Sequence, residues 1–157
     1  MNNKITNVLF AGIGGQGIIT ASDMLTEAAF RMGFDVKKSE LHGMSQRGGS
    51  VSSDVRFGDK VFSPMIPRGE ADYLVAVTED QIEVCAGYLK PDCVIIRPSD
   101  FSDEVANSKM LNTAMLGKLN TYLKFPEELW IELLKSSFKA EIAESNIAVF
   151  RSAAESK

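Results

Sequence analysis

Apolar and polar positions in the first forty residues follow two different periods. Residues 7–11 form a short apolar run of the kind found in a strand that is buried on both faces. Residues 18–32 place apolar side chains on one side at helical spacing, and Gly33 follows as a natural helix stop. Residues 35–40 are a plausible second strand. The pattern predicts strand, glycine turn, helix and strand, which is a βαβ unit.

The middle of the chain has the patterns of further strands. Residues 51–57 alternate between apolar and polar, as in a half-exposed strand, and residues 60–62 suggest a hairpin return. Residues 73–77 and 93–96 are short buried strands. Between them, the sequence Thr-Glu-Asp-Gln resembles a capping box, which predicts a helix over residues 78–88.

The composition changes after Pro98. Residues 101–109 are polar and predict a loop, whereas the remainder has helical spacing. Pro126 suits a helix start. Two apolar stripes at helical spacing predict packing surfaces: Met115, Leu116, Leu119, Tyr122 and Leu123, then Leu129, Trp130, Leu133, Leu134 and Phe138. We predict one domain over residues 1–157 of class α/β: a three-layer, Rossmann-like domain with a mixed sheet and a helical C-terminal third.

Composition and charge narrow the possible functions. The chain has 157 residues, 45% of them hydrophobic and 24% charged, and its formal net charge of −4 disfavours nucleic acid as the main partner. No apolar run approaches the roughly 20 residues of a membrane helix, and the polar N-terminus lacks the layout of a signal peptide. We therefore expect a cytoplasmic protein with no membrane partner. Its two cysteines suggest no disulfide framework.

A glycine loop follows the first predicted strand. Gly12, Gly14 and Gly17 have the spacing G-x-G-x-x-G between a strand and a helix, the context in which this pattern indicates a phosphate site. We expect Gly12 to allow the tight turn, Gly14 to allow close approach of a ligand, and Gly17 to allow helix–strand packing. Glu40 could occupy the acidic position that binds a ribose. A glycine turn that serves only packing is the equally weighted alternative.

The stretch from Glu40 to Ser50 contains a second group of candidate residues. It holds the single histidine, an arginine and three glycines, so its backbone can approach a ligand or a partner closely. Arg47 could bind a phosphate or carboxylate as a planar fork. His42 could be an acid, a base or a hydrogen-bond donor, but a structural or surface role is favoured for a lone histidine. The candidates here are His42, Ser45, Gln46, Arg47, Gly48 and Gly49.

Several catalytic and metal-binding motifs are missing from the sequence. There is no P-loop lysine signature, no Cys-x-x-Cys pair and no four-cysteine set for an iron–sulfur cluster. A Ser-His-Asp set cannot be assembled around one histidine, and no cluster has metal-ligand spacing. Cys85 and Cys93 are expected to be packing residues. The sequence thus predicts binding features without a catalytic residue or a bound metal.

Three segments resemble a known family. Residues 7–20 (NVLFAGIGGQGIIT), 38–56 (KSELHGMSQRGGSVSSDVR) and 69–76 (GEADYLVA) are similar to the gamma-type domain of 2-oxoacid:ferredoxin oxidoreductases. The form Gly-x-Gly-Gly-Gln-Gly is more specific than a lone G-x-G-x-x-G. Residues 42–49 (HGMSQRGG) look most like the small beta subunit of indolepyruvate oxidoreductase. A weaker similarity extends through residues 112–150.

The resemblance implies a non-catalytic subunit. The complete enzyme would oxidatively decarboxylate a 2-oxoacid with coenzyme A and reduce ferredoxin. Thiamine diphosphate and iron–sulfur clusters would lie in a larger partner subunit, so this chain alone would bind no cofactor. The resemblance makes candidate site and interface residues of Gly12, Gly14, Gly15, Gln16, Gly17 and residues 42–49. We expect Arg47→Ala to weaken coenzyme A use more than assembly.

Two other functions remain open from the sequence. A free-standing Rossmann-type dehydrogenase or nucleotide-binding module would bind a dinucleotide as an isolated chain. A binding or regulatory protein would be stable, monomeric and free of ligand. A subunit, by contrast, should expose a large apolar patch that a partner covers.

Overall fold

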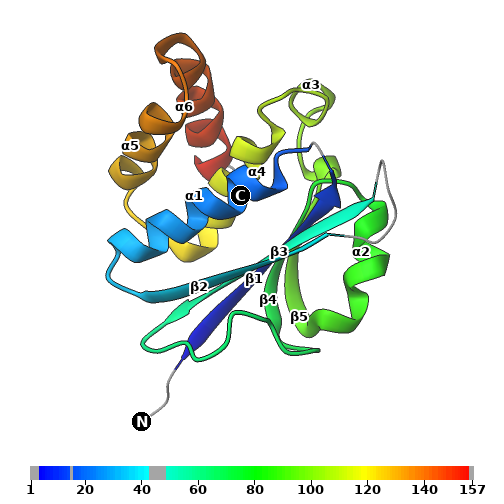
Figure 1. Ribbon diagram of the computed structural model, residues 1–157. Coiled ribbons are helices and arrows are strands. Elements are labelled where there is room, and N and C mark those ends of the chain that lie inside the picture. The colour runs from blue at the N-terminus through cyan, green and yellow to red at the C-terminus, as the bar shows by residue number, and fades with distance from the viewer. Residues whose placement is uncertain (1–3, 15, 43–48, 156–157) are drawn as a thin grey trace. The chain divides into compact units, whose positions relative to one another are not determined.

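A computed structural model describes residues 4–14, 16–42 and 49–155, with the side chain of residue 42 outside the description. The chain forms two compact units, Met1–Pro98 and Ser99–Lys157. The first contains the whole sheet and the second is helical (Figure 1). The helical C-terminal third predicted from the sequence is therefore confirmed.

The first unit is built on a five-stranded mixed sheet with the order β2-β3-β1-β4-β5. The strands are β1 (Ile5–Ile13), β2 (Asp35–His42), β3 (Ser50–Gly58), β4 (Ala71–Ala76) and β5 (Leu89–Ile96). β1, β4 and β5 run parallel, whereas β3 is antiparallel to both β1 and β2. The prediction of a mixed α/β sheet is confirmed.

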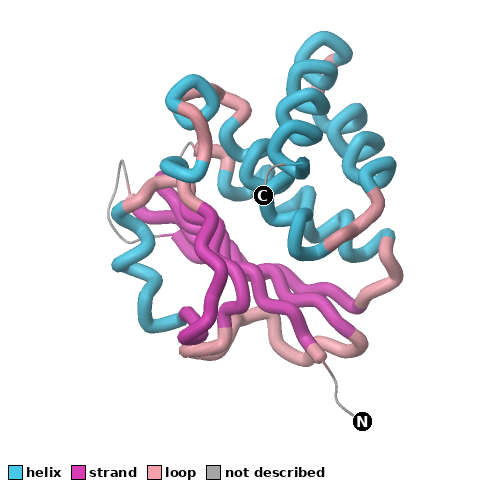
Figure 2. Tube along the Cα trace, turned by 180° about the vertical axis from the view of Figure 1, so that it is seen from behind, coloured by secondary structure: helices cyan, strands magenta, loops and turns pink. Residues whose placement is uncertain are grey.

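Helices cover both faces of this sheet, which gives the three layers predicted from the sequence. α1 (Ile18–Arg31) packs on one face, and α2 (Asp80–Cys85) with the following 3-10 turn (Ala86–Tyr88) lies on the other (Figures 1 and 2). Side chains alternate along β1, so that Leu9 and Ala11 pack in a buried cluster with Cys85 of α2. The intervening apolar residues of β1 serve the other face, which explains why residues 8–11 are continuously apolar.

The position of β3 separates this sheet from that of a dinucleotide-binding domain. In the Rossmann order the second strand lies beside the first, and its terminal acidic residue reaches the ribose. Here β3 lies between β1 and β2. Glu40 of β2 instead forms an ion pair with Lys38, which also contacts Asp23 of α1. The suggested ribose-binding role of Glu40 therefore does not fit this sheet.

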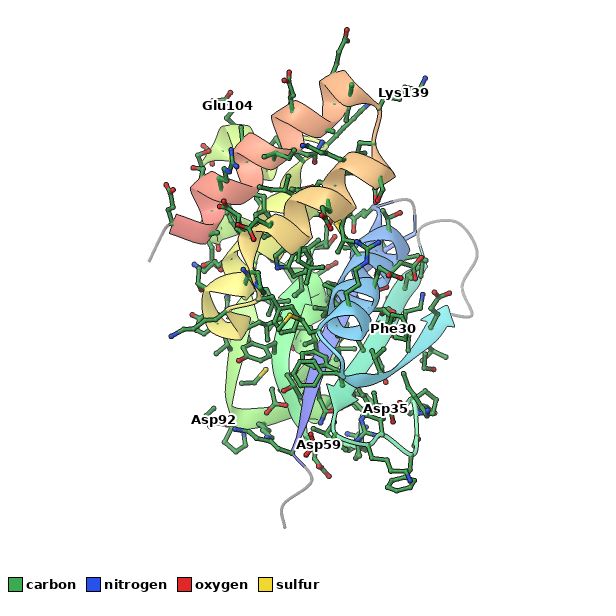
Figure 3. The ribbon with its side chains drawn as sticks, turned by 90° about the vertical axis from the view of Figure 1, so that its left-hand side faces the viewer. Phe30, Asp35, Asp59, Asp92, Glu104 and Lys139 are labelled. Atoms are coloured by element: carbon green, nitrogen blue, oxygen red, sulfur yellow. The ribbon has the colours of Figure 1, made fainter. Side chains whose placement is uncertain are left out.

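The segment that follows β3 also differs from the prediction. Residues 60–62 form no strand, because the segment 59–70 crosses the end of the sheet as a loop anchored to β3. The Arg56 Nη1 donates to the carbonyl oxygens of Ser63 at 2.7 Å and Met65 at 3.3 Å. Asp35 of β2, labelled in Figure 3, accepts a hydrogen bond of 2.7 Å from the Val61 amide. Side chains of two strands thus replace the predicted hairpin pairing.

Two further predictions about this unit were wrong. No capping box opens α2: Glu79 is its N-cap residue, and no side chain caps the helix. The predicted helix over residues 78–88 is a shorter α-helix followed by a 3-10 turn. The strand predicted over residues 93–96 begins earlier, because β5 starts at Leu89, and the pairing of β4 with β5 shifts register between Ala71 and Tyr73.

The second unit consists of α3 (Asp103–Ala106), α4 (Leu111–Leu123), α5 (Glu127–Ser137) and α6 (Ala140–Glu155). Pro126 precedes α5 as its N-cap residue, as predicted. Trp130 is fully buried, with its ring 5.3 Å from that of Phe150. The segment predicted as a loop contains the short helix α3, because the Ser102 hydroxyl accepts a hydrogen bond from the Val105 amide.

Candidate anion-binding site at the glycine loop

The candidate site lies where β1 ends and α1 begins. β1 ends at Ile13 and α1 starts at Ile18, with Gly17 as the N-cap residue. The first N–H groups of a helix have no partner within the helix, and they lie at the positive end of its dipole. No side chain caps α1 and its first turn holds no acidic residue. The helix start is therefore open to an anion.

A pocket of about 290 Å³ lies at this helix start. Its walls come from the end of β1, the first turn of α1 and the start of β3; the lining residues are Ile13, Gly14, Gly17, Ile18, Ile19, Thr20 and Val51. None of these side chains is charged. Among the described residues, the groups available to an anion are therefore backbone N–H groups and the helix dipole, which also bind phosphate in glycine-loop sites.

Gln16 fixes the shape of the loop. Its Oε1 accepts hydrogen bonds from the Ile13 amide at 2.7 Å and from the Thr78 hydroxyl at 2.6 Å. Thr78 follows β4, so this one oxygen joins the loop to the neighbouring parallel strand. Within the part of the chain that is described, Gln16 positions the loop that forms the pocket.

Gly49 links the two groups of candidates. The Gly14 amide donates to the Gly49 carbonyl oxygen at 3.1 Å, because Ile13 of β1 pairs with Ser50 of β3. Gly49, the residue before β3, therefore contacts the glycine loop, a contact that the sequence did not predict.

The glycines have different roles from those expected. A Cβ on Gly12 would lie 2.6 Å from the Ile18 Cδ1, so Gly12 allows helix–strand packing. Gly17 has a φ of 79°, in the left-handed region, so it makes the turn. The functions suggested for Gly12 and Gly17 are thus exchanged. A Cβ on Gly14 would meet no described atom closer than 3.9 Å, which leaves room for a ligand.

The remaining candidates cannot be placed. Gly15, Ser45, Gln46, Arg47 and Gly48 lie outside the described residues, as does the side chain of His42. Their suggested roles stay predictions.

The cysteines have the properties of packing residues. Burial raises the pKa of the Cys85 thiol, and burial together with the charge of Asp72 raises the pKa of Cys93 to about 11. Both thiols are therefore protonated at neutral pH in the metal-free chain, as expected for packing residues and not for reactive thiols. The described residues contain no group of three or more His, Cys, Asp and Glu side chains that could hold a metal.

No helix in the described ranges has both the length and the apolar character needed to cross a membrane.

The mixed sheet, with a glycine loop that leads from its first strand into an uncapped helix, defines an α/β domain with a glycine loop. The family described as pyruvate ferredoxin/flavodoxin oxidoreductase matches residues 7–102, which is more than half of the chain. The chain belongs to this family, so the resemblance noted in the sequence is confirmed.

One relative illustrates the similarity in sequence. Indolepyruvate oxidoreductase subunit IorB of Pyrococcus horikoshii is 45% identical over 87 residues, which cover 55% of this chain and 43% of the relative. The chain thus spans less than half the length of that relative.

Two solved structures share the fold. Pyruvate oxidoreductase subunit PORC of Thermotoga maritima has a TM-score of 0.78 at 21% identity, covering 97% of this chain and 96% of the other. The 2-oxoglutarate:ferredoxin oxidoreductase of Magnetococcus marinus, with 2-oxoglutarate, coenzyme A and succinyl-CoA bound, also has a TM-score of 0.78 at 21% identity. That match covers 97% of this chain and 31% of the Magnetococcus marinus chain.

Proposed function

We propose that this chain is the gamma-type subunit of a 2-oxoacid:ferredoxin oxidoreductase, and that it acts with a larger catalytic subunit. Family membership supports this reading. The observation that carries it is the pocket at the start of α1, which has no charged lining residue and lies next to a helix N-terminus whose N–H groups can bind an anionic group. Its role would be positional, because holding a reactant in place lowers a barrier without any catalytic side chain.

Coenzyme A is the ligand that best fits this pocket. Its phosphates could accept hydrogen bonds from the N–H groups at the start of α1. A homologous fold occurs in the Magnetococcus marinus enzyme, which was solved with coenzyme A bound. Arg47 lies outside the described residues, but an arginine near this pocket would add the charge that the lining residues lack.

The redox and thiamine chemistry would belong to the partner subunit. Thiamine diphosphate would supply the group on which a 2-oxoacid is decarboxylated, and iron–sulfur clusters would pass electrons to ferredoxin. The support for placing the iron–sulfur clusters elsewhere is that the described residues contain no group of three or more His, Cys, Asp and Glu side chains that could hold a metal.

Indolepyruvate is the substrate we favour for the complex. The support is the 45% identity to the Pyrococcus horikoshii IorB subunit, although that match covers 43% of the relative. Pyruvate is the alternative, because the Thermotoga maritima pyruvate oxidoreductase subunit matches over nearly the whole chain in fold.

Affinity purification from the source cells under native, anaerobic conditions tests the proposal. We expect a larger subunit to co-purify in fixed ratio, and the complex to reduce ferredoxin in a reaction that needs a 2-oxoacid and coenzyme A. Comparing indolepyruvate, pyruvate and 2-oxoglutarate then identifies the substrate. A chain that purifies alone with a bound dinucleotide would instead support an independent nucleotide-binding protein.

A further inference from the structure

A second concave surface lies on the α2 face of the sheet, within the first unit. We call it the α2 groove: it has a volume of about 380 Å³ and is bounded by β2, β3, α2 and the loop that follows β3. In the sheet register Asp54 of β3 is paired with Ser39 of β2 and Leu9 of β1, and all three line the groove. α2 covers the β1–β4 side of this face, so the groove exposes the part over β2 and β3.

The walls of the α2 groove are apolar and exposed. Leu41 of β2 is 65% exposed, Met65 of the loop 60% and Val84 of α2 64%, and Tyr88 closes the end of the wall at 38%. Three separate elements thus present large apolar side chains around one depression. Contiguous exposed apolar surface of this kind marks a site that another molecule covers.

The floor of the groove is polar, and no cationic side chain is among the described residues that line it. Asp54 is the one charged residue among its described lining residues. One carboxylate oxygen of Asp54 accepts a hydrogen bond of 2.9 Å from the Ile66 amide. Burial raises the pKa of Asp54 against the opposing effect of Arg56, whose guanidinium is engaged by Asn7 and two carbonyl oxygens. Among the described residues, the carboxylate therefore has no direct cationic partner.

Gln81 adds a second polar group to the lining of the groove, and the residue is 6% exposed. Its side-chain amide can both donate and accept a hydrogen bond from a molecule in the groove. The groove thus requires an occupant with apolar surface and at least one hydrogen-bond donor.

A second copy of this chain does not meet that requirement. A two-fold interface places the same patch on both subunits, so two α2 grooves would bring carboxylates together without a cation. A protein segment that combines apolar side chains with a lysine or arginine satisfies both the walls and the floor, because a desolvated cation would pair with Asp54.

We propose that the α2 groove is a docking site for the larger catalytic subunit, which inserts an apolar segment bearing a lysine or arginine. This inference rests on the proposed function, since it names the surface through which that subunit is held. The glycine-loop pocket opens on the other face of the sheet, because Val51 lines the pocket whereas Ser50 and Ser52 line the groove. Docking in the groove would therefore leave the pocket accessible.

Two substitutions in the full-length chain test the docking site. Asp54→Asn keeps the shape and an acceptor for the Ile66 amide but removes the charge. Val84→Lys places a cation on the exposed wall, where it would repel the inserted one. Ile142→Lys is the matched control, because Ile142 is a similarly exposed apolar residue on a helix of the second unit. Circular dichroism and thermal unfolding verify that each variant is folded.

Binding of each variant to the purified thiamine-diphosphate-bearing subunit is measured by biolayer interferometry. We expect Asp54→Asn and Val84→Lys each to weaken binding by about tenfold or more, and Ile142→Lys to leave it unchanged. If the wild-type chain binds and both groove variants bind within about twofold of it, the docking site is wrong but the proposed function stands. If the wild-type chain does not bind, the proposed function itself fails, and the docking site with it.

Discussion

The glycine-loop pocket and the α2 groove lie on opposite faces of one sheet. Successive residues of β3 line one site or the other. Val51 lines the pocket, whereas Ser50 and Ser52 line the groove. The pocket lies at a helix start and carries no charged lining residue. The groove is shaped by side chains from β2, β3, α2 and a loop, with Asp54 at its floor.

This difference determines what each site can select. Backbone N–H groups at a helix start recognise an anion of almost any structure, so specificity at the pocket must come from outside it. Apolar walls around a carboxylate and an amide recognise one arrangement of surface and charge. We therefore associate the pocket with a ligand shared by many enzymes and the groove with one partner subunit.

The largest expected effect comes from filling the pocket. Gly14→Val adds methyl groups beside Val51 in a position where a Cβ meets no described atom within 3.9 Å. The apparent affinity of the complex for coenzyme A should fall roughly ten- to hundredfold, the loss of one or two charge-assisted hydrogen bonds. Steady-state kinetics with varied coenzyme A measures it. An unchanged KM for coenzyme A in a folded, assembled variant would show that the pocket is not its site.

Gly12→Ala should destabilise the fold. The new Cβ would lie 2.6 Å from the Ile18 Cδ1 and 2.8 Å from the Gln16 Oε1. Overpacking at this contact should lower the free energy of unfolding by about 1–3 kcal/mol, measured by urea denaturation. The double variant Gly12→Ala/Ile18→Val removes the clashing Cδ1 and should recover part of the loss. No recovery would mean that the clash is not the cause.

Thr78→Val tests the hydrogen bond between Thr78 and Gln16, which holds the glycine loop in place. It removes the hydroxyl that donates to the Gln16 Oε1 at 2.6 Å, while keeping the side-chain volume. Stability should fall by about 1 kcal/mol, and the KM for coenzyme A should rise. Thr121→Val, which removes a hydroxyl bonded to the Lys118 carbonyl oxygen, is the matched control. If both variants change KM equally, the hydrogen bond from Thr78 has no special role.

The smallest effect is expected from Asp54→Asn on the isolated chain. Because burial raises the pKa of Asp54 above its unfolded value, ionisation opposes folding, and this cost grows as pH rises from the unfolded pKa through the folded one. The variant should therefore be slightly more stable than the wild type at pH 7, with a smaller difference in acid below the ordinary carboxyl range. Thermal unfolding at both pH values checks this sign. A variant that is less stable at pH 7 would show that a favourable interaction stabilises the Asp54 carboxylate, which would contradict the proposal that the carboxylate needs a cation from a partner.

Local patterns predicted the strand, glycine loop and helix that form the pocket, because those elements are adjacent in the chain. They also predicted α4 and α5, each from its own apolar stripe at helical spacing. The exchange of roles between Gly12 and Gly17 was not predictable, since it depends on the contact with Ile18 and on one backbone angle. Thr78 was predicted to be a helix cap, because its hydrogen bond to Gln16, 62 residues away, leaves no signal in the local sequence.

By itself the sequence determined the α/β class, the family and the glycine-loop position, since each depends on residues within short segments. Only the tertiary structure decided that β3 lies between β1 and β2, which removes Glu40 from a ribose-binding position. It alone assembled the α2 groove, whose residues extend from Leu9 to Tyr88. The physical reason is that strand order and the burial of Asp54 and Gln81 are set by contacts between distant segments, which periodicity does not encode.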